Sequence, residues 1–147
     1  MGSMIYKSLP REFHKKFEVV SCFIEYKGDI LLLHRQNHKP EGDMWGVPAG
    51  KIDEGETILE AMVREMREET GLKILPGNLT YFNKVFVKFP EYDFVYHMFS
   101  MPLREKPEIK INKDEHKDFT WTSPKNALSM NLMRDLDSCI KLFYGAL

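Results

Sequence analysis

The order of strand-like and helix-like segments predicts an α+β fold. Two pairs of apolar and aromatic runs, within 16–35 and 79–101, are each joined by a short turn and resemble β-hairpins. A charged segment between them, 57–70, has helical periodicity, and a second apolar helix is expected after residue 131. The chain of 147 residues, 43% of them hydrophobic, fits one globular domain, which we expect to span 4–147.

Composition and charge argue against several function classes. The formal net charge of −1 disfavours a protein that binds nucleic acid through a basic face. Neither a signal peptide nor an apolar run of membrane-spanning length is visible in the sequence. Cys22 and Cys139 lack the spacing of metal ligands, and we expect two reduced core thiols. These features predict a cytoplasmic protein. Residues 1–3 precede a second methionine and are interpreted as a cloning scar.

The first hairpin is predicted from two β-rich runs. Residues 16–26 are rich in β-branched and aromatic side chains, and 27–29 form a turn signal. Residues 30–35 then form a second, largely buried strand that ends at Arg35. The polar loop that follows, 36–43, is long enough to border a cleft.

The segment 57–70 is predicted to be a helix that presents a dense negative patch and ends at Gly71. Four positions form an apolar stripe at about 100° per residue: Leu59, Met62, Val63 and Met66. Three glutamates at spacings i, i+3 and i+4 are expected well away from that stripe: Glu65, Glu68 and Glu69. Their repulsion disfavours the helix, and a hard divalent cation would reverse this. The alternative is a solvated face with ion pairs to Arg64.

The complete spacing of this stretch favours the metal site. From Gly50 the chain has five residues, Glu56, seven residues and then the run REMREETGL, which ends at Leu72. This pattern resembles the signature of the Nudix hydrolases, G-x5-E-x7-R-E-U-x-E-E-x-G-U, where U is a bulky apolar residue. Every specified position matches, with Met66 and Leu72 at the two U sites.

The resemblance implies both a fold and a chemistry. The implied fold is a mixed, curved β-sheet sandwiched between α-helices. The implied reaction is hydrolysis of a nucleoside diphosphate linked to another moiety, with Mg²⁺ as cofactor or Mn²⁺ in its place. Four groups are implied as metal ligands: the Gly50 carbonyl and the carboxylates of Glu65, Glu68 and Glu69. Arg64 is implied to pair with one of the signature glutamates and to fix its orientation.

Three more residues are candidates for the site. Glu56 belongs to the signature and lies at the N-terminal end of the helix, where negative charge suits the helix dipole. Glu115 precedes Trp121 with the family spacing E-x5-W, which implies a metal ligand or general base; a solvated loop acid is the alternative. Arg35 is implied to contact the phosphates or the base, and otherwise is a surface arginine. Which glutamate acts as general base stays open.

The second half of the chain is predicted to hold the other hairpin and two helices. Its strands are expected at 79–89 and 92–101, with most aromatic side chains in the core and one or two at the mouth of the cleft. Residues 108–111 are expected to form a short edge strand, and Ser123 to cap a short helix. Asn131 is expected to begin the last helix as its cap; alternatively it reads a guanine edge, as in MutT-type enzymes.

The choice among substrate classes rests only on the absence of markers of other subfamilies. The markers of the NADH pyrophosphatases, ADP-ribose hydrolases and coenzyme A hydrolases are not evident, and the tyrosine of dinucleoside polyphosphate hydrolases is displaced to Tyr92. The first hypothesis is a MutT-like enzyme that converts a nucleoside triphosphate, modified or not, to the monophosphate and pyrophosphate. The alternatives are a dinucleoside polyphosphate or nucleotide-sugar hydrolase, and a non-catalytic nucleotide-sensing module. We expect a monomer or homodimer with a small-molecule nucleotide substrate and no nucleic-acid or membrane partner.

Overall fold

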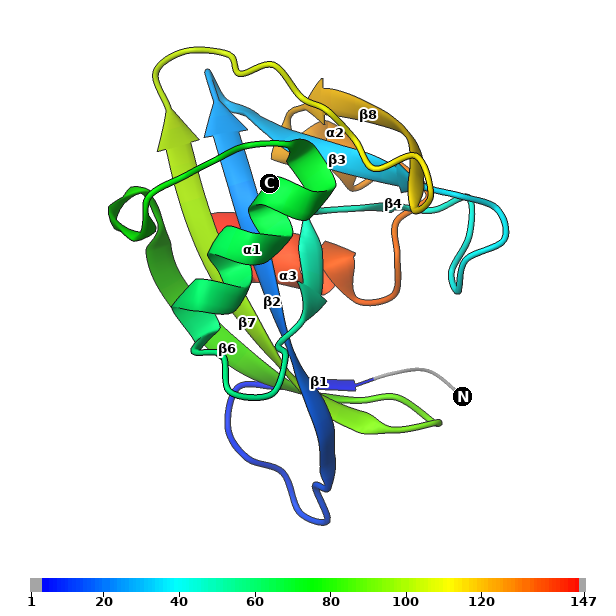
Figure 1. Cartoon of the computed structure of the whole chain (residues 1–147). Helices are drawn as coiled ribbons and strands as arrows, with labels where there is room; N and C mark the ends of the chain where they lie inside the picture. Colours follow the sequence, from blue (N-terminus) through cyan, green and yellow to red (C-terminus); the bar gives the residue numbers. More distant parts are fainter. Residues whose placement is uncertain (1–3, 146–147) are drawn as a thin grey trace.

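A mixed eight-stranded β-sheet forms the centre of the computed structural model, which describes residues 4–145 (Figure 1). Residues 1–3, which were interpreted as a cloning scar, lie outside that range. The strand order of the sheet is β1-β6-β7-β2-β3-β4, with β5 paired to β2 and β8 paired to β3. Of these pairs, β2 and β7 run parallel and the others antiparallel. The strands are Met4–Tyr6 (β1), Lys15–Tyr26 (β2), Asp29–Arg35 (β3), Trp45–Gly46 (β4), Ala49–Lys51 (β5), Thr80–Lys88 (β6), Asp93–Leu103 (β7) and His116–Thr122 (β8).

Helices cover both faces of the sheet. The helix α1 (Ile58–Thr70) lies in front of the sheet in Figure 1, and α3 (Leu136–Tyr144) lies behind it. The short helix α2 (Pro124–Ala127) packs on the same side as α3, and a 3₁₀ turn, η1 (Pro76–Asn78), leads into β6. The expected mixed sheet between helices is therefore confirmed. Among the helices of residues 4–145, none is long and apolar enough to cross a membrane.

Two apolar clusters, one on each face, hold the helices to the sheet. Successive residues of β3 point to opposite faces, so that Leu31 and Leu33 pack under α1 while Leu32 packs on the side of α3. The two cysteines are divided in the same way. Cys22 belongs to the α1 side and Cys139 to the α3 side, and both are buried free thiols, as predicted.

Both predicted hairpins are present, but the first one splits. β2 and β3 pair only beside their turn, at Glu25 with Ile30 and Tyr26 with Asp29. Farther from the turn β2 pairs with β7 and β3 pairs with β8. The segment 45–51 lies between the separated parts of β2 and β3, where β4 pairs with β3 and β5 pairs with β2. The split therefore brings the start of the signature into the sheet.

The expected edge strand at 108–111 is wrong. Within the described residues this segment pairs with no strand, and it runs past the C-terminal end of α1. The Lys110 backbone N–H donates to the Thr70 carbonyl oxygen at 2.8 Å. Ile109 and Ile111 pack against the apolar cluster on the α1 side. The alternation of apolar Ile109 and Ile111 with polar residues thus reflects packing against the core and not pairing with a neighbouring strand.

Candidate active site

The helix α1 is capped at both ends, at Gly71 as predicted and at Thr57 by a capping box that was not predicted. Thr57 and Glu60 form a capping box: Thr57 Oγ1 accepts from the Glu60 N–H at 3.0 Å, and Glu60 Oε1 accepts from the Thr57 N–H at 2.9 Å. Gly71 ends the helix at φ 76°, and its N–H donates to the Arg67 carbonyl oxygen at 3.0 Å. These contacts set which side chains of α1 face the sheet.

The apolar stripe predicted for α1 is partly wrong, because the buried face of the helix includes a glutamate. Ala61, Met62 and Met66 are fully buried, whereas Leu59 is 37% exposed. Glu69 follows Met62 by about two helical turns and therefore lies on the same side. It is only 4% exposed. The glutamates are thus not all on a face turned away from the core, and the solvated-face alternative fails for Glu69.

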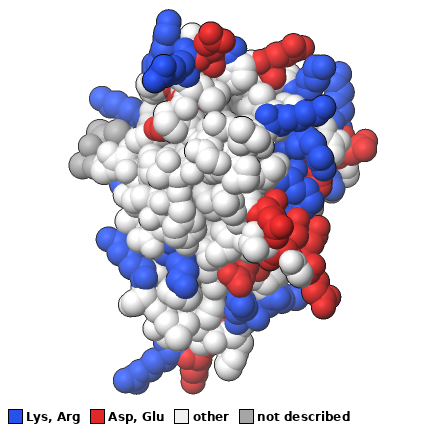
Figure 2. Space-filling model, turned by 60° about the vertical axis from the view of Figure 1, so that its left-hand side comes forward, with Lys and Arg blue, Asp and Glu red and all other residues white. Residues whose placement is uncertain are grey.

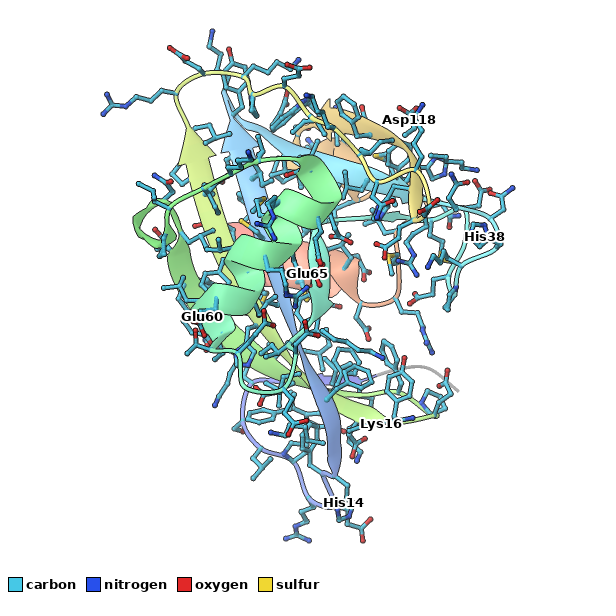
Figure 3. The ribbon with its side chains drawn as sticks, in the orientation of Figure 1. His14, Lys16, His38, Glu60, Glu65 and Asp118 are labelled. Carbon is cyan, nitrogen blue, oxygen red and sulfur yellow. The ribbon has the colours of Figure 1, made fainter. Side chains whose placement is uncertain are left out.

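Glu65 and Gly50 meet where α1 faces β5. A Cβ atom at Gly50 would overlap the Glu65 carboxylate, so any larger residue here would displace that carboxylate from its position. Figure 3 shows Glu65 on the side of α1 that faces β5, with Glu60 on the outer side. The Glu65 side chain is 14% exposed, and its burial raises the pKa of its carboxyl despite a hydrogen bond from Arg64. Glu65 therefore sits at the border of the core.

Glu69 is held against the strand β5. The Ala49 backbone N–H donates to Glu69 Oε1 at 2.7 Å. Burial raises the pKa of the Glu69 carboxyl well above its usual value, and the negative charges of Glu65 and Glu115 add to this effect. We call Glu65, Glu69 and Glu115 the carboxylate cluster. A cation bound among them would relieve the repulsion that raises the pKa of Glu69.

Arg64 binds three of the signature glutamates. Its Nε and Nη2 atoms donate to the two oxygens of Glu56 at 2.7 and 2.9 Å, which is a bidentate pair. Its Nη1 atom lies 2.8 Å from Glu65 Oε1 and 3.1 Å from Glu68 Oε1. The hydrogen bond from Arg64 lowers the pKa of Glu56 to about 2. Arg64 thus orders the carboxylates around it, and Glu56 faces the arginine.

Glu115 and His116 lie far from the signature in sequence but close to Glu69 in the fold. Glu115 directly precedes β8, and its carbonyl oxygen accepts from the Gln36 N–H at 2.9 Å. Pairing of β8 with β3 places His116 opposite Arg35. One ligand atom each from Glu69, Glu115 and His116 lies within 4.8 Å of the others. The structure therefore brings Glu115 to the signature helix.

His116 was not predicted as a site residue. It is 4% exposed, and its Nδ1 atom has no hydrogen-bond partner among residues 4–145. Burial and the nearby charge of Arg35 lower the pKa of His116 to about 4, so its imidazole is neutral and carries a free lone pair. Its one sequence signal is that it follows Glu115 directly at the start of a strand.

These residues fit a divalent metal ion. Carboxylate oxygens are the ligands that Mg²⁺ and Mn²⁺ prefer, and imidazole nitrogen suits transition metals. The close approach at Gly50 leaves the Glu65 carboxylate room beside the backbone. The unpartnered nitrogen of His116 and the raised pKa of Glu69 both indicate groups that a cation would satisfy. Glu68, with a side chain 44% exposed, lies on the solvent side of this group.

A cavity of about 260 Å³ adjoins the carboxylate cluster. Ala49 and Gly50 form part of its lining, so that the cavity and the cluster share the strand β5. Five aromatic side chains form much of its wall: Phe17, Phe89, Tyr92, Phe94 and Tyr96. Arg35 also borders the cavity, and its guanidinium donates to the Pro40 carbonyl oxygen at 3.1 Å. Aromatic side chains from β2, from β7 and from the turn before β7 thus lie around one cavity with Arg35.

Asn131 does not cap the last helix, because α3 begins five residues later at Leu136. Its segment is instead held extended against β4. The Trp45 N–H donates to the Asn131 carbonyl oxygen at 2.8 Å, and the Met133 N–H donates to the Trp45 carbonyl oxygen at 3.0 Å. Asn131 is not among the residues that line the cavity. The cavity is bordered instead by Met133 and the residues that follow it.

The charged side chains of the surface are unevenly distributed. On the face shown in Figure 2, the largest group of acidic side chains lies on the right and smaller ones lie at the top and bottom, while lysines and arginines lie at several separate places around a broad uncharged area. No single basic band crosses that face. The near-zero net charge of the whole chain, −1, therefore comes from local groups of opposite sign.

Known proteins share this sequence and this fold. The family model described as NUDIX domain matches residues 15–143. The CTP pyrophosphohydrolase of Escherichia coli K12 is 28% identical over 120 residues, which cover 80% of this chain and 84% of that protein. The NAD-capped RNA hydrolase NudC of Haemophilus influenzae is 33% identical over 94 residues, which cover 64% of this chain and 34% of that protein.

Solved structures agree with the family match. The MutT protein from Methanosarcina mazei superposes with a TM-score of 0.73 at 25% identity, covering 93% of this chain and 100% of that one. The Escherichia coli ORF135 protein superposes with a TM-score of 0.69 at 26% identity, covering 89% and 88%. The matched residues include the whole signature and Glu115. The chain therefore belongs to the Nudix family and is a Nudix hydrolase, a pyrophosphohydrolase of nucleotide derivatives.

Proposed function

We propose that this Nudix hydrolase uses Mg²⁺, or Mn²⁺ in its place, to convert a nucleoside triphosphate into the monophosphate and pyrophosphate. The observation that carries the proposal is the shared strand β5, which borders both the carboxylate cluster and the aromatic cavity. A nucleotide has a planar aromatic base at one end and anionic phosphates at the other. Its two ends match the two parts of the site. Similarity to a CTP pyrophosphohydrolase over most of both chains supports the same reaction.

The carboxylate cluster is the proposed metal site. Glu69, Glu115 and the neighbouring His116 would hold the ion. Glu65, the Gly50 carbonyl and the more exposed Glu68 would be further ligands. Such an ion neutralises phosphate charge and lowers the pKa of water. Glu115 or a signature glutamate left free by the metal would accept the proton of the attacking water.

Two arginines have different proposed roles. Arg64 is bound to Glu56, Glu65 and Glu68, so it orients the carboxylates and does not reach the substrate. Arg35 borders the cavity at the end of β3 and would contact a phosphate or the base. Its planar guanidinium suits paired hydrogen bonds to either group.

The test is a panel of nucleotides incubated with the purified protein and Mg²⁺, with products separated by ion-exchange chromatography. Nucleoside triphosphates, dinucleoside polyphosphates and nucleotide sugars are compared at equal concentration. We expect monophosphate and pyrophosphate from at least one triphosphate, and no products from it after metal is removed with EDTA. Preferred cleavage of a dinucleoside polyphosphate or nucleotide sugar would contradict the proposed substrate class.

A matched pair of variants connects that activity to the site. Glu69→Gln removes a charge from the carboxylate cluster, and Glu54→Gln makes the same chemical change at an exposed position in the loop before α1. We expect Glu69→Gln to lose activity and Glu54→Gln to keep it. Tight nucleotide binding by the wild type without turnover of any compound would favour the nucleotide-sensing alternative.

A further inference from the structure

The carboxylate of Glu115 comes from a short turn beside the end of β3, which we call the Glu115 turn (residues 112–115). The bonds that close this turn are local. The N–H groups of Glu115 and His116 donate to the Asn112 carbonyl oxygen at 3.0 and 2.9 Å. Because these bonds lie within the turn, they do not fix its distance from α1. The position of Glu115 near Glu69 therefore depends on bonds from the turn to other parts of the chain.

Gln36 makes such bonds to the Glu115 turn and to the residue after it. Its side-chain Nε2 donates to the Lys113 carbonyl oxygen at 2.8 Å and to the His116 carbonyl oxygen at 3.4 Å, the second bond being longer and weaker. Its backbone N–H donates to the Glu115 carbonyl oxygen at 2.9 Å. Gln36 is half-buried and directly follows β3, so the sheet sets its position. It thus joins the backbone on both sides of Glu115 to the sheet.

Glu115 needs this support because it faces like charges. The carboxylates of Glu65 and Glu69 lie close enough to act on it electrostatically. Carboxylates that bind a metal must be ionised, so these three repel one another until the ion arrives. Glu65 and Glu69 come from α1, which is capped at both ends, whereas Glu115 comes from a turn. The repulsion should displace the turn more easily than the helix.

The competing explanation is that Gln36 only stabilises the loop 36–43. That loop has a second support, because Lys117 Nζ donates to Asn37 Oδ1 and to Asp43 Oδ1, each at 2.7 Å. The bonds of Lys117 end on the loop, whereas the side-chain bonds of Gln36 end on Lys113 and His116. Variants at Lys117 and Gln36 can therefore separate loosening of the loop from displacement of the Glu115 turn.

We propose that Gln36 is a positioning residue of the metal site, and that its side chain holds the Glu115 turn where the Glu115 carboxylate binds the ion. The proposal rests on the proposed function, because it takes the carboxylate cluster as the metal site. Gln36 directly follows Arg35, which borders the cavity, so the end of β3 serves both parts of the site. Residues that orient metal ligands change metal affinity roughly 10- to 100-fold when they are replaced.

The test is a double-mutant cycle on Mn²⁺ affinity, measured by electron paramagnetic resonance of the free ion without any substrate. It compares the wild type, Gln36→Met, Glu115→Gln and the double variant. Methionine has nearly the length of glutamine but no N–H donor. We expect Gln36→Met to weaken Mn²⁺ binding about 10-fold in the wild-type background. In the Glu115→Gln background it should weaken binding by less than about threefold, because the carboxylate that Gln36 positions is gone.

Lys117→Met is the matched control, and it should bind Mn²⁺ like the wild type. Calorimetry with EDTA checks that each variant is folded. If Gln36→Met does not fold, Gln36→Asn replaces it in the cycle, since its amide stops one methylene short of the same carbonyl oxygens. At saturating Mn²⁺, kcat should fall in the Gln36 variant while KM for the nucleotide stays within about twofold, because the nucleotide contacts are unchanged.

Several results would overturn the role of Gln36. Unchanged Mn²⁺ affinity in the folded Gln36 variant would do so, as would an equal loss in the wild-type and Glu115→Gln backgrounds. A loss of the same size in Lys117→Met would assign the effect to the loop.

Failure of the proposed function can be separated from failure of this inference. A loss of Mn²⁺ affinity that depends on Glu115 would retain the role of Gln36, even if the wild type cleaved no nucleoside triphosphate. Triphosphate cleavage by the wild type, together with unchanged Mn²⁺ affinity in Gln36→Met, would retain the proposed function and overturn this role. Absence of Mn²⁺ binding by the wild type would overturn both.

Discussion

Replacing Glu69 by glutamine should separate the stability of the protein from its metal binding. The substitution keeps an oxygen for the hydrogen bond from Ala49 but removes a buried negative charge beside Glu65 and Glu115. Burial and these neighbours raise the pKa of Glu69, so its ionised form is disfavoured in the folded protein. Without metal, we therefore expect Glu69→Gln to be at least as stable as the wild type near neutral pH.

The contribution of Glu69 to the free energy of unfolding should decrease as the pH rises. An unfolded glutamate loses its proton at a pH of about 4.3, whereas folded Glu69 keeps its proton to higher pH. Above the unfolded pKa the unfolded state releases this proton more readily than the folded state. The metal-free wild type should then lose stability as the pH rises from about 4.3 through the higher folded pKa. Glu69→Gln should lack this part of the loss.

Bound metal should make the wild type more stable than Glu69→Gln, the reverse of the order expected without metal. An ion at about 100 times its Kd stabilises the folded state by about 2.7 kcal/mol. For a chain of this length, that corresponds to a rise in Tm of roughly 5–10 °C. Glu69→Gln, which lacks one ligand charge, should show little rise at the same metal concentration.

Differential scanning calorimetry with EDTA and then with Mg²⁺ or Mn²⁺ measures both parts of this prediction. Glu54→Gln is the matched control, since it changes the same side chain at an exposed position and should follow the wild type. An equal metal-induced rise in Tm for Glu69→Gln would refute the assignment of Glu69 as a ligand. A metal-free Glu69→Gln protein much less stable than wild type would refute the reasoning from its raised pKa.

Three further predictions follow from the same contacts. Gly50→Ala places a Cβ atom against the Glu65 carboxylate, so kcat should fall at least about 10-fold and metal binding should weaken, as measured by titration calorimetry. Arg64→Lys loses the paired bonds to Glu56 and should lower kcat/KM about 10- to 100-fold while the far-ultraviolet circular dichroism stays unchanged. His116→Asn should weaken Mn²⁺ binding more than Mg²⁺ binding in competition titrations followed by electron paramagnetic resonance, because imidazole suits transition metals. Equal weakening of both ions would contradict a direct contact by His116.

The signature helix could be predicted because its information is local. Thr57 and Glu60 define its start, Gly71 defines its end, and the spacing between them fixes the order of the glutamates. The side of the helix that is buried was harder to predict. Glu69 counted as a surface charge in the pattern, but its contact with Ala49 comes from β5, which the helix meets only in the folded chain.

The remaining features depend on contacts between distant parts of the chain. Pairing of β8 with β3 brings His116 to the signature helix, and nothing near it in sequence shows that its Nδ1 atom is buried without a partner. Asn131 has the side chain of a good helix cap, yet backbone bonds to Trp45 hold it in an extended segment. Asp135 lies beside the cavity because that same segment delays the start of α3.

The most direct test of the proposed reaction is phosphorus NMR of a nucleoside triphosphate during turnover with Mg²⁺. The carboxylate cluster beside the aromatic cavity predicts pyrophosphate and nucleoside monophosphate as the first products, appearing at equal rates and absent with Glu69→Gln. Release of orthophosphate and the nucleoside diphosphate as the first products, or wild-type rates with Glu69→Gln, would contradict it.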